Sequence, residues 1–118
     1  MKYGDALLEV QTQIEAAGIP CYIDTEKAMA PCALLIPGMV RFDRLSGSQD
    51  YTAEVDVYLL APNNSSFIAL NELQDLLEQL QTAFPIPEAE PIAYPLGTAG
   101  NIPLPGLAIT LNLNVSKD

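Results

Sequence analysis

The carboxylates of this sequence are its most obvious candidates for chemistry, because several of them stand two residues apart. The pairs are Asp24 with Glu26, Glu54 with Asp56, and Glu88 with Glu90. Residues i and i+2 of a strand point to the same face, so Glu54 and Asp56 are placed to bind a hard cation or to share a proton. The chain has fifteen acidic residues to distribute, and an exposed polar strand face is the simpler interpretation of this pair.

The residue types needed for most other active sites are missing. The sequence has no histidine, which removes the commonest general base, the Ser–His and Cys–His nucleophile pairs and most zinc sites. Cys21 and Cys32 form no CxxC motif, and two cysteines favour buried thiols over a disulfide framework. No glycine-rich run resembles a phosphate-binding loop. We therefore expect a protein that is not an enzyme and that uses no cofactor or metal.

The net charge of −10 argues against two classes of partner. Binding to a nucleic-acid backbone needs clustered Lys and Arg, and only Arg41 and Arg44 are near neighbours among the five basic residues. No apolar run approaches the ~20 residues that span a bilayer. The N-terminus acquires Asp5 and Glu9 early, unlike a signal peptide. We expect no direct nucleic-acid binding, no membrane role, and synthesis in the cytoplasm.

Two helices are predicted from apolar residues spaced three and four apart. The first is expected from about Tyr3 to Ala17, ended by Gly18 and Pro20. The second is expected from about Phe67 to Thr82 and should lie on a sheet. Its apolar stripe is formed by Leu70, Leu73, Leu77, Leu80 and Phe84, with Ala69 and Leu76 beside it.

Two strands show clear alternation of apolar and polar residues, Tyr51–Leu60 and Leu107–Val115, and these should pair antiparallel. Shorter strands are expected at Cys21–Asp24, Ala33–Ile36 and Met39–Leu45, with Pro37 and Gly38 bending or breaking the chain between the last two. Between the first two, residues 25–31 are expected to form a loop, in which residues 26–29 have the composition for one helical turn.

The stretch from Pro85 to Pro105 contains six of the ten prolines, which excludes most regular structure apart from a short extended piece around residues 92–94. We expect a stiff arm that lies against a partner. Together the elements predict one α+β domain over residues 1–118, with a mainly antiparallel sheet of about four to five strands flanked by two α-helices.

The order of these elements resembles that of the tail terminator proteins of long-tailed bacteriophages. The resemblance rests on an N-terminal helix, a short strand, the Pro-preceded strand PCALLI at residues 31–36, the long strand Tyr51–Leu60, a Leu-rich helix and a last strand introduced by residues 105–107. It implies a homo-oligomeric ring, of six copies, that caps the tail tube and contacts the tail-tube and head-connector proteins. Such a protein belongs to the virion tail, is assembled in the host cytoplasm, and lets DNA pass through its lumen. The long Pro85–Pro105 stretch departs from the pattern.

Two segments are the expected interfaces of that ring, a polar loop and the proline-rich arm. Their candidate residues are Arg41, Arg44, Ser46, Gln49, Asp50, Ile92, Tyr94, Leu96 and Ile102. Arginine pairs well with the carboxylates of a neighbouring acidic subunit, although pairing of Arg41 and Arg44 with Asp43 or Asp50 of the same chain fits as well.

Three alternative functions remain open. The first is another head–tail or tail-tube completion protein, and the second is a small acidic module that binds a basic protein. The third, a hydrolase with paired carboxylates, requires Glu54 and Asp56 to lie in a cleft.

Overall fold

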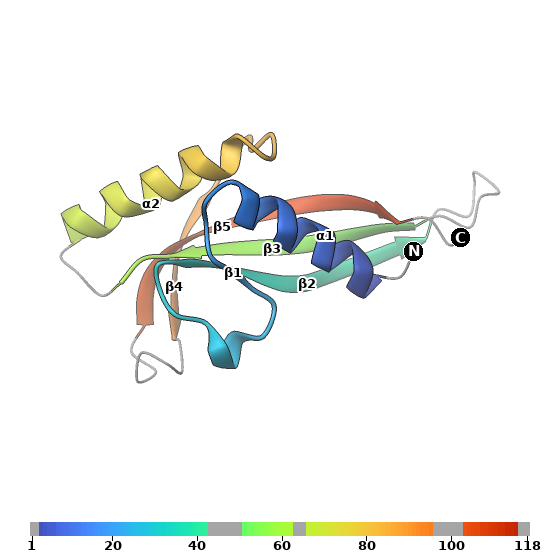
Figure 1. Cartoon of the computed structure of the whole chain (residues 1–118), viewed down its shortest axis with the longest axis horizontal. Helices are drawn as coiled ribbons and strands as arrows, with labels where there is room; N and C mark the ends of the chain where they lie inside the picture. The colour runs from blue at the N-terminus through green and yellow to red at the C-terminus, as the bar shows by residue number, and fades with distance from the viewer. Residues whose placement is uncertain (1–2, 43–50, 63–65, 96–102, 116–118) are drawn as a thin grey trace.

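A computed structural model describes residues 3–42, 51–62, 66–95 and 103–115 of the chain (Figure 1). Its elements are α1 (Tyr3–Ala16), β1 (Cys21–Tyr22), the 3₁₀ helix η1 (Thr25–Lys27), β2 (Cys32–Phe42), β3 (Tyr51–Leu60), α2 (Ser66–Gln81), β4 (Glu90–Pro95) and β5 (Pro103–Val115). The strands form one sheet in the order β1-β2-β3-β5-β4, in which β1 and β2 are parallel and all other neighbours are antiparallel. This confirms the predicted α+β fold with a mainly antiparallel sheet.

Strand β3 occupies the middle of the sheet, between β2 and β5. Val57 lies opposite Leu35 of β2 and Ile109 of β5, as expected for the predicted antiparallel pairing with the last strand. Its odd-numbered residues, Ala53 to Leu59, are completely buried. The even-numbered residues point to the other face, so the alternation in the sequence separates a dry face from a wetter one.

Both long helices cover the same face of the sheet, which we call the helix-covered face (Figure 1). Their buried residues join Val55, Val57 and Leu59 of β3 in one core; the helix residues are Leu7, Val10 and Ile14 of α1 and Ala69, Leu73, Leu76 and Leu80 of α2. Helix α1 ends as predicted, because Gly18 has a φ of 95° and the N–H of Ile19 donates back to the carbonyl of Ile14 at 3.4 Å.

The opposite face of the sheet, which we call the open face, is covered by no described α-helix. The segment around η1 crosses one end of it, where Ala28 packs with Cys32, Leu34, Leu60 and Leu104 in a second, smaller cluster. Strand β1 ends at Tyr22, earlier than predicted, because Asp24 starts a turn. The Asp24 carboxylate accepts the N–H of Glu26 at 3.0 Å, and the Asp24 backbone carbonyl accepts the N–H of Lys27. The single helical turn considered for this segment is present as η1.

Of the two outcomes predicted for Pro37 and Gly38, a bend and a break, the break does not occur, because β2 is continuous from Cys32 to Phe42. The ladder absorbs these residues as a β-bulge between Pro37 and Val40. At the bulge, the hydroxyl of Tyr3 accepts the N–H of Gly38 at 3.3 Å and donates to the carbonyl of Glu54. The hydroxyl thus bridges β2 and β3 where the bulge separates them, and the N-terminal helix is fastened to the sheet.

The prediction that residues 85–105 lack regular structure is also wrong in part. Residues Glu90–Pro95 form β4, which pairs with β5, and β5 begins at Pro103 rather than at Leu107. Strand β4 lies at the edge of the sheet and needs hydrogen bonds on one side only, so Pro91 and Pro95 fit it without breaking the ladder. The extended piece predicted around residues 92–94 is confirmed, but it belongs to the chain's own sheet and is not an arm.

The buried stripe of α2 differs from the predicted one at its start. Ala69 is buried and Leu70 is 63% exposed, while Leu73 and Leu80 are buried as expected. The buried positions 69, 73, 76 and 80 follow the i, i+4, i+7, i+11 spacing of a helix face, and Leu70 lies beside that face.

The bulge makes Gly38 sensitive to substitution. A Cβ atom at Gly38 would lie 2.9 Å from the Glu54 carbonyl oxygen, whereas one at Gly4 would have no atom within 4 Å. We expect Gly38→Ala to lower the free energy of unfolding by about 1–3 kcal/mol. Gly4→Ala, its matched control in α1, should leave that free energy unchanged or raise it by up to about 1 kcal/mol. Urea denaturation compares the two variants, and equal effects would contradict the tight bulge.

Candidate functional site

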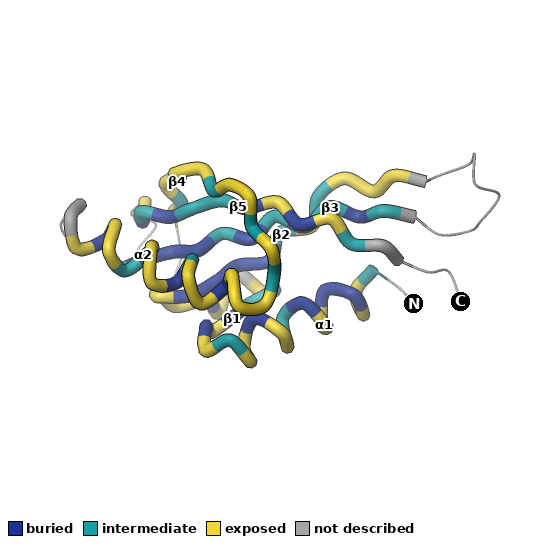
Figure 2. The backbone as a smooth tube through the Cα atoms, turned by 90° about the horizontal axis from the view of Figure 1, so that it is seen from above, coloured by how far each residue is buried: buried dark blue, intermediate teal, exposed yellow. Residues whose placement is uncertain are grey.

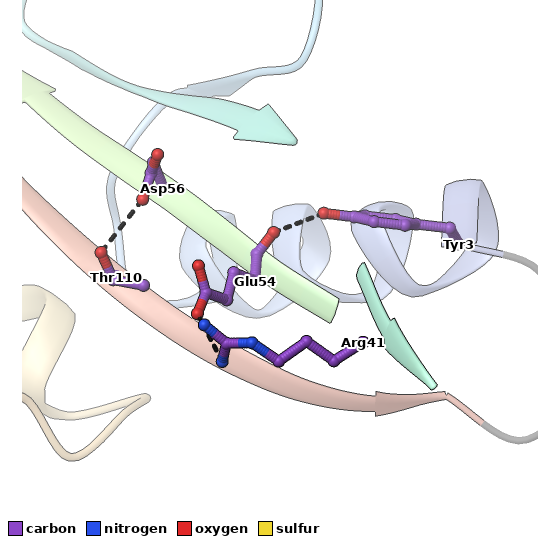
Figure 3. A network of polar contacts seen from close by, with 5 residues as sticks. All are labelled: Tyr3, Arg41, Glu54, Asp56 and Thr110. Atoms are coloured by element: carbon purple, nitrogen blue, oxygen red, sulfur yellow. Dashed lines mark hydrogen bonds and ion pairs between the residues drawn. The ribbon is translucent and has the colours of Figure 1, made fainter. Parts of the chain in front are cut away.

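The polar half of the open face is built by β2, β3 and β5 (Figure 3). Arg41 Nη1 lies 2.9 Å from Glu54 Oε1, and the Thr110 hydroxyl donates to Asp56 Oδ1 at 3.0 Å. Each of the two carboxylates on β3 therefore has its own partner on a neighbouring strand. Arg41 pairs within the chain, as one of the two alternatives held, and the partner found among the described residues is Glu54; Asp43 and Asp50 lie outside the described residues.

Glu54 and Asp56 lie on one face, as their spacing predicts. Glu54 lines a hollow of ≈ 620 Å³ together with Glu88, Glu90 and Thr110, among others, whereas Asp56 is not part of its lining. Within the described ranges, no group of three or more His, Cys, Asp or Glu side chains is arranged to hold a metal ion. A hydrolase that uses both carboxylates requires them in one cleft, and this hollow is lined by Glu54 without Asp56.

The other half of the open face is aromatic and apolar. The rings of Tyr58 and Tyr94 have centroids 5.6 Å apart and are inclined by 57°. Together with Ile92, they pack against the smaller cluster. Tyr94 and Ile92, expected at an interface, are therefore half-buried against their own sheet.

The other predicted interface residues lie outside the described residues; they are Arg44, Ser46, Gln49, Asp50, Leu96 and Ile102. Of the remaining three, Ile92 and Tyr94 lie together on β4, opposite Gly106 and Leu104. Arg41 lies opposite Thr52, close to the other end of β3. The open face therefore holds these three residues at its two ends and does not gather them into one site.

Sequence reasoning missed two exposed apolar places. One is a groove of ≈ 380 Å³ between α2 and the β4–β5 hairpin, lined in part by Leu70 and Pro91. The other is Met39, 59% exposed, with Val40 beside it on β2. The spacing of a helix face could have identified Leu70 as exposed. The buried series of positions 73, 76 and 80 continues back to Ala69 and not to Leu70.

The two thiols lie on opposite faces of the sheet. Cys21 pairs with Ala33 and belongs to the core under the helices, while Cys32 belongs to the smaller cluster. Burial raises the pKa of Cys21 to about 12, with Glu15 and Cys32 adding to the effect, and burial raises the pKa of Cys32 to about 11. Both are free and remain protonated thiols at neutral pH, which makes them poor nucleophiles.

Comparisons with known protein families, with characterised proteins and with solved structures found no match to this chain. None of the described helices is long and apolar enough to cross a membrane. What the protein does is therefore inferred from its own surface and from the order of its elements.

The raised pKa values predict a loss of stability in alkali. Protonated thiols stabilise the fold fully below their ordinary pKa of 9.0, and this contribution is lost as the pH rises through 9 toward 12. We expect the free energy of unfolding to fall over that interval, and to fall less steeply in Cys21→Ala than in the parent chain. Cys32→Ala should show a smaller change, because its pKa is raised less. Urea denaturation at a series of pH values measures both slopes, and a Cys21→Ala slope equal to that of the parent would contradict the assignment.

Proposed function

We propose that this chain is a structural subunit of the tail end of a long-tailed bacteriophage, similar to the tail terminator proteins. In this proposal, six copies form a ring that caps the tail tube and joins it to the head connector, and the ring is assembled in the host cytoplasm. The support for it is the order α1, β1, β2, β3, α2, β5, which is the order on which the resemblance rests. Strand β4 is an addition to that order.

The shape of the chain suits assembly better than an enclosed site. Its Cα radius of gyration is 15.1 Å, against about 13.5 Å for a compact domain of this length. One sheet face is partly uncovered, and exposed apolar side chains occur on both α2 and β2. A subunit that must contact several neighbours needs such extended surface.

The charge of the chain fits a channel that DNA crosses. With a net charge of −10, the surface repels phosphate, so DNA passes without adhering to the wall. The same charge opposes self-association at low ionic strength, since each copy carries it. Assembly of a ring therefore depends on contacts that outweigh this repulsion.

A second candidate function, an acidic module that binds a basic protein, is favoured by the hollow lined by Glu54, Glu88 and Glu90. This function needs only one copy of the chain. It predicts a stable monomer that captures a single cationic target, whereas the ring proposal predicts association.

The mass of the purified protein distinguishes the two. We expect six-fold rings, seen by electron microscopy and by light scattering from micromolar to millimolar concentration, with more ring at 0.5 M salt than at 0.01 M. Salt favours association because the Debye length shortens from about 30 Å at 0.01 M to under 8 Å above physiological strength. A closed two-fold dimer would count against the ring, and a monomer under every condition would favour the acidic module.

A further inference from the structure

Strand β5 is longer than the strand that covers its outer edge. It runs from Pro103 to Val115, whereas β4 pairs with it only as far as Ala108, which lies opposite Glu90. Beyond that pair, no other described strand pairs with β5 on this side. The stretch of β5 at residues 109–115, which we call the free edge, thus extends past β4 toward the C-terminus (Figure 1).

The free edge directs backbone groups outward. Successive residues of a strand direct their N–H and C=O groups to opposite sides. The carbonyl of Pro105 accepts the N–H of Ala61 at 3.0 Å, so the odd-numbered residues of β5 face β3. The register with β3 is unbroken from Gly106 to Val115, so the even-numbered residues face away from β3. The residues that offer backbone donors and acceptors to a further strand are therefore Thr110, Asn112 and Asn114.

The free edge lacks the features that protect the other edges of this sheet. Strand β4 contains Pro91 and Pro95, and β2 contains Pro37 next to its bulge. Prolines and bulges hinder the addition of a strand. Strand β4 is exposed or half-buried along its whole length, as expected at an edge (Figure 2). The free edge contains no proline, no charged residue and no bulge, so it is the place where this sheet can accept another strand.

Carboxylates lie directly beside the free edge. Thr110 and Asn112 line the hollow of ≈ 620 Å³ on the open face together with Glu54, Glu88 and Glu90. No basic side chain lines this hollow. A strand added at the free edge therefore passes these carboxylates, which attract a cationic side chain and repel an acidic one.

Two of these carboxylates are available to a partner. Glu54 is paired with Arg41 across the strands (Figure 3), whereas the described part of the chain shows no ion pair of Glu88 or Glu90. Both of these glutamates are exposed. An arriving lysine or arginine can thus pair with Glu88 or Glu90 without breaking a contact of the free protein.

The same charges argue against a second copy as the added strand. Each hollow includes Asn112, so two free edges paired antiparallel around Asn112 would set two hollows side by side. Glu88 and Glu90 of one copy would then approach the same residues of the other, and like charges across strands are destabilising. A basic strand meets no such repulsion.

We propose that the free edge binds an extended segment of a basic partner protein as an added antiparallel strand. Residues of this segment opposite Thr110 and Asn112 share the open face with them, and are lysines or arginines that pair with Glu88 and Glu90. The residues between them are apolar and extend the helix-covered face beside Leu111. This inference is independent of the ring proposal, since one copy of the chain contains the whole site.

A short synthetic peptide in which lysine alternates with valine, blocked at both ends, tests the proposal. We expect its titration to shift the NMR signals of the backbone amides of Thr110, Asn112 and Asn114. Lysines opposite these residues in an antiparallel pair direct their N–H groups toward β5. Methylation of the lysine backbone nitrogens should therefore weaken binding at least about 10-fold, because it removes hydrogen bonds and adds bulk at the contact. Methylation of the valine backbone nitrogens is the matched control and should leave the affinity unchanged.

A variant of the chain tests the same contact from the other side. Asn112→Pro removes an outward donor and spares the ladder with β3, because the N–H of Asn112 faces away from β3. We expect the peptide to bind this variant about 10-fold more weakly than the parent. Asn112→Ala keeps the backbone donor and should bind like the parent. Urea denaturation of both variants verifies that the fold persists.

The role of the carboxylates is tested by removing two charges at a time. The double variant Glu88→Gln with Glu90→Gln should bind the lysine peptide about 10-fold more weakly at low ionic strength, and the difference should shrink as salt screens the charges. The matched control is Glu9→Gln with Glu26→Gln, which removes two exposed carboxylates that do not line the hollow. It should bind like the parent.

Four outcomes would overturn the proposal. The first is no binding of the lysine peptide to the parent chain, and the second is an equal effect of the two methylations. The third is equal binding of a peptide with glutamate in place of lysine, which would exclude a basic partner. The fourth is a dimer of the parent chain, formed without peptide and lost in Asn112→Pro, which would mean that a second copy occupies the free edge.

Discussion

The burial of one face of β3 is the constraint on which the rest of the structure depends. Ala53, Val55, Val57 and Leu59 are completely enclosed between the flanking strands and the two helices. A shift of register by a single residue would place Glu54 and Asp56 in that core without partners. The positions of β2 and β5 beside β3, and of both helices above it, follow from the need to keep this face dry.

That arrangement also explains why the polar and the exposed apolar surfaces lie where they do. Because both helices lie on one face, the other face is left to η1 at one end and to strand side chains elsewhere. The polar part of this face is stabilised by pairs across strands, Arg41 with Glu54 and Thr110 with Asp56. Some apolar side chains on β2 and on α2 remain exposed, because they lie at the borders of the helix-covered face, where no other element packs on them.

The sequence was sufficient where one periodicity dominated. The two alternating strands, their antiparallel pairing and both helices could be predicted, since their patterns reflect burial on one side. The sequence was insufficient where a proline or a glycine is compatible with more than one local structure. Pro37 and Gly38 fit a break and a bulge equally well, and the choice depends on the hydroxyl of Tyr3, which is 35 residues away. Pro91 and Pro95 fit a loop and an edge strand equally well, and the choice depends on β5 being available as a neighbour.

The candidate site was less predictable than the fold. The shared face of Glu54 and Asp56 followed from their spacing, but their separate partners come from distant strands. Arg41 was correctly recognised as a residue that pairs with carboxylates, while its partner Glu54 was not foreseen. The groove beside Leu70 arises from the angle between a helix and a hairpin, and no local pattern encodes such an angle.

The placement of the two cysteines on opposite faces has a consequence for the folding of the chain. Cys21 belongs to the large core and Cys32 to the small cluster near η1, so each thiol is protected by a different set of contacts. If the small cluster opens locally while the core persists, Cys32 becomes reactive toward thiol reagents before Cys21 does. If the two clusters open only together, the thiols react at one common rate. The native chain thus contains two internal reporters of whether its two apolar layers form one cooperative unit.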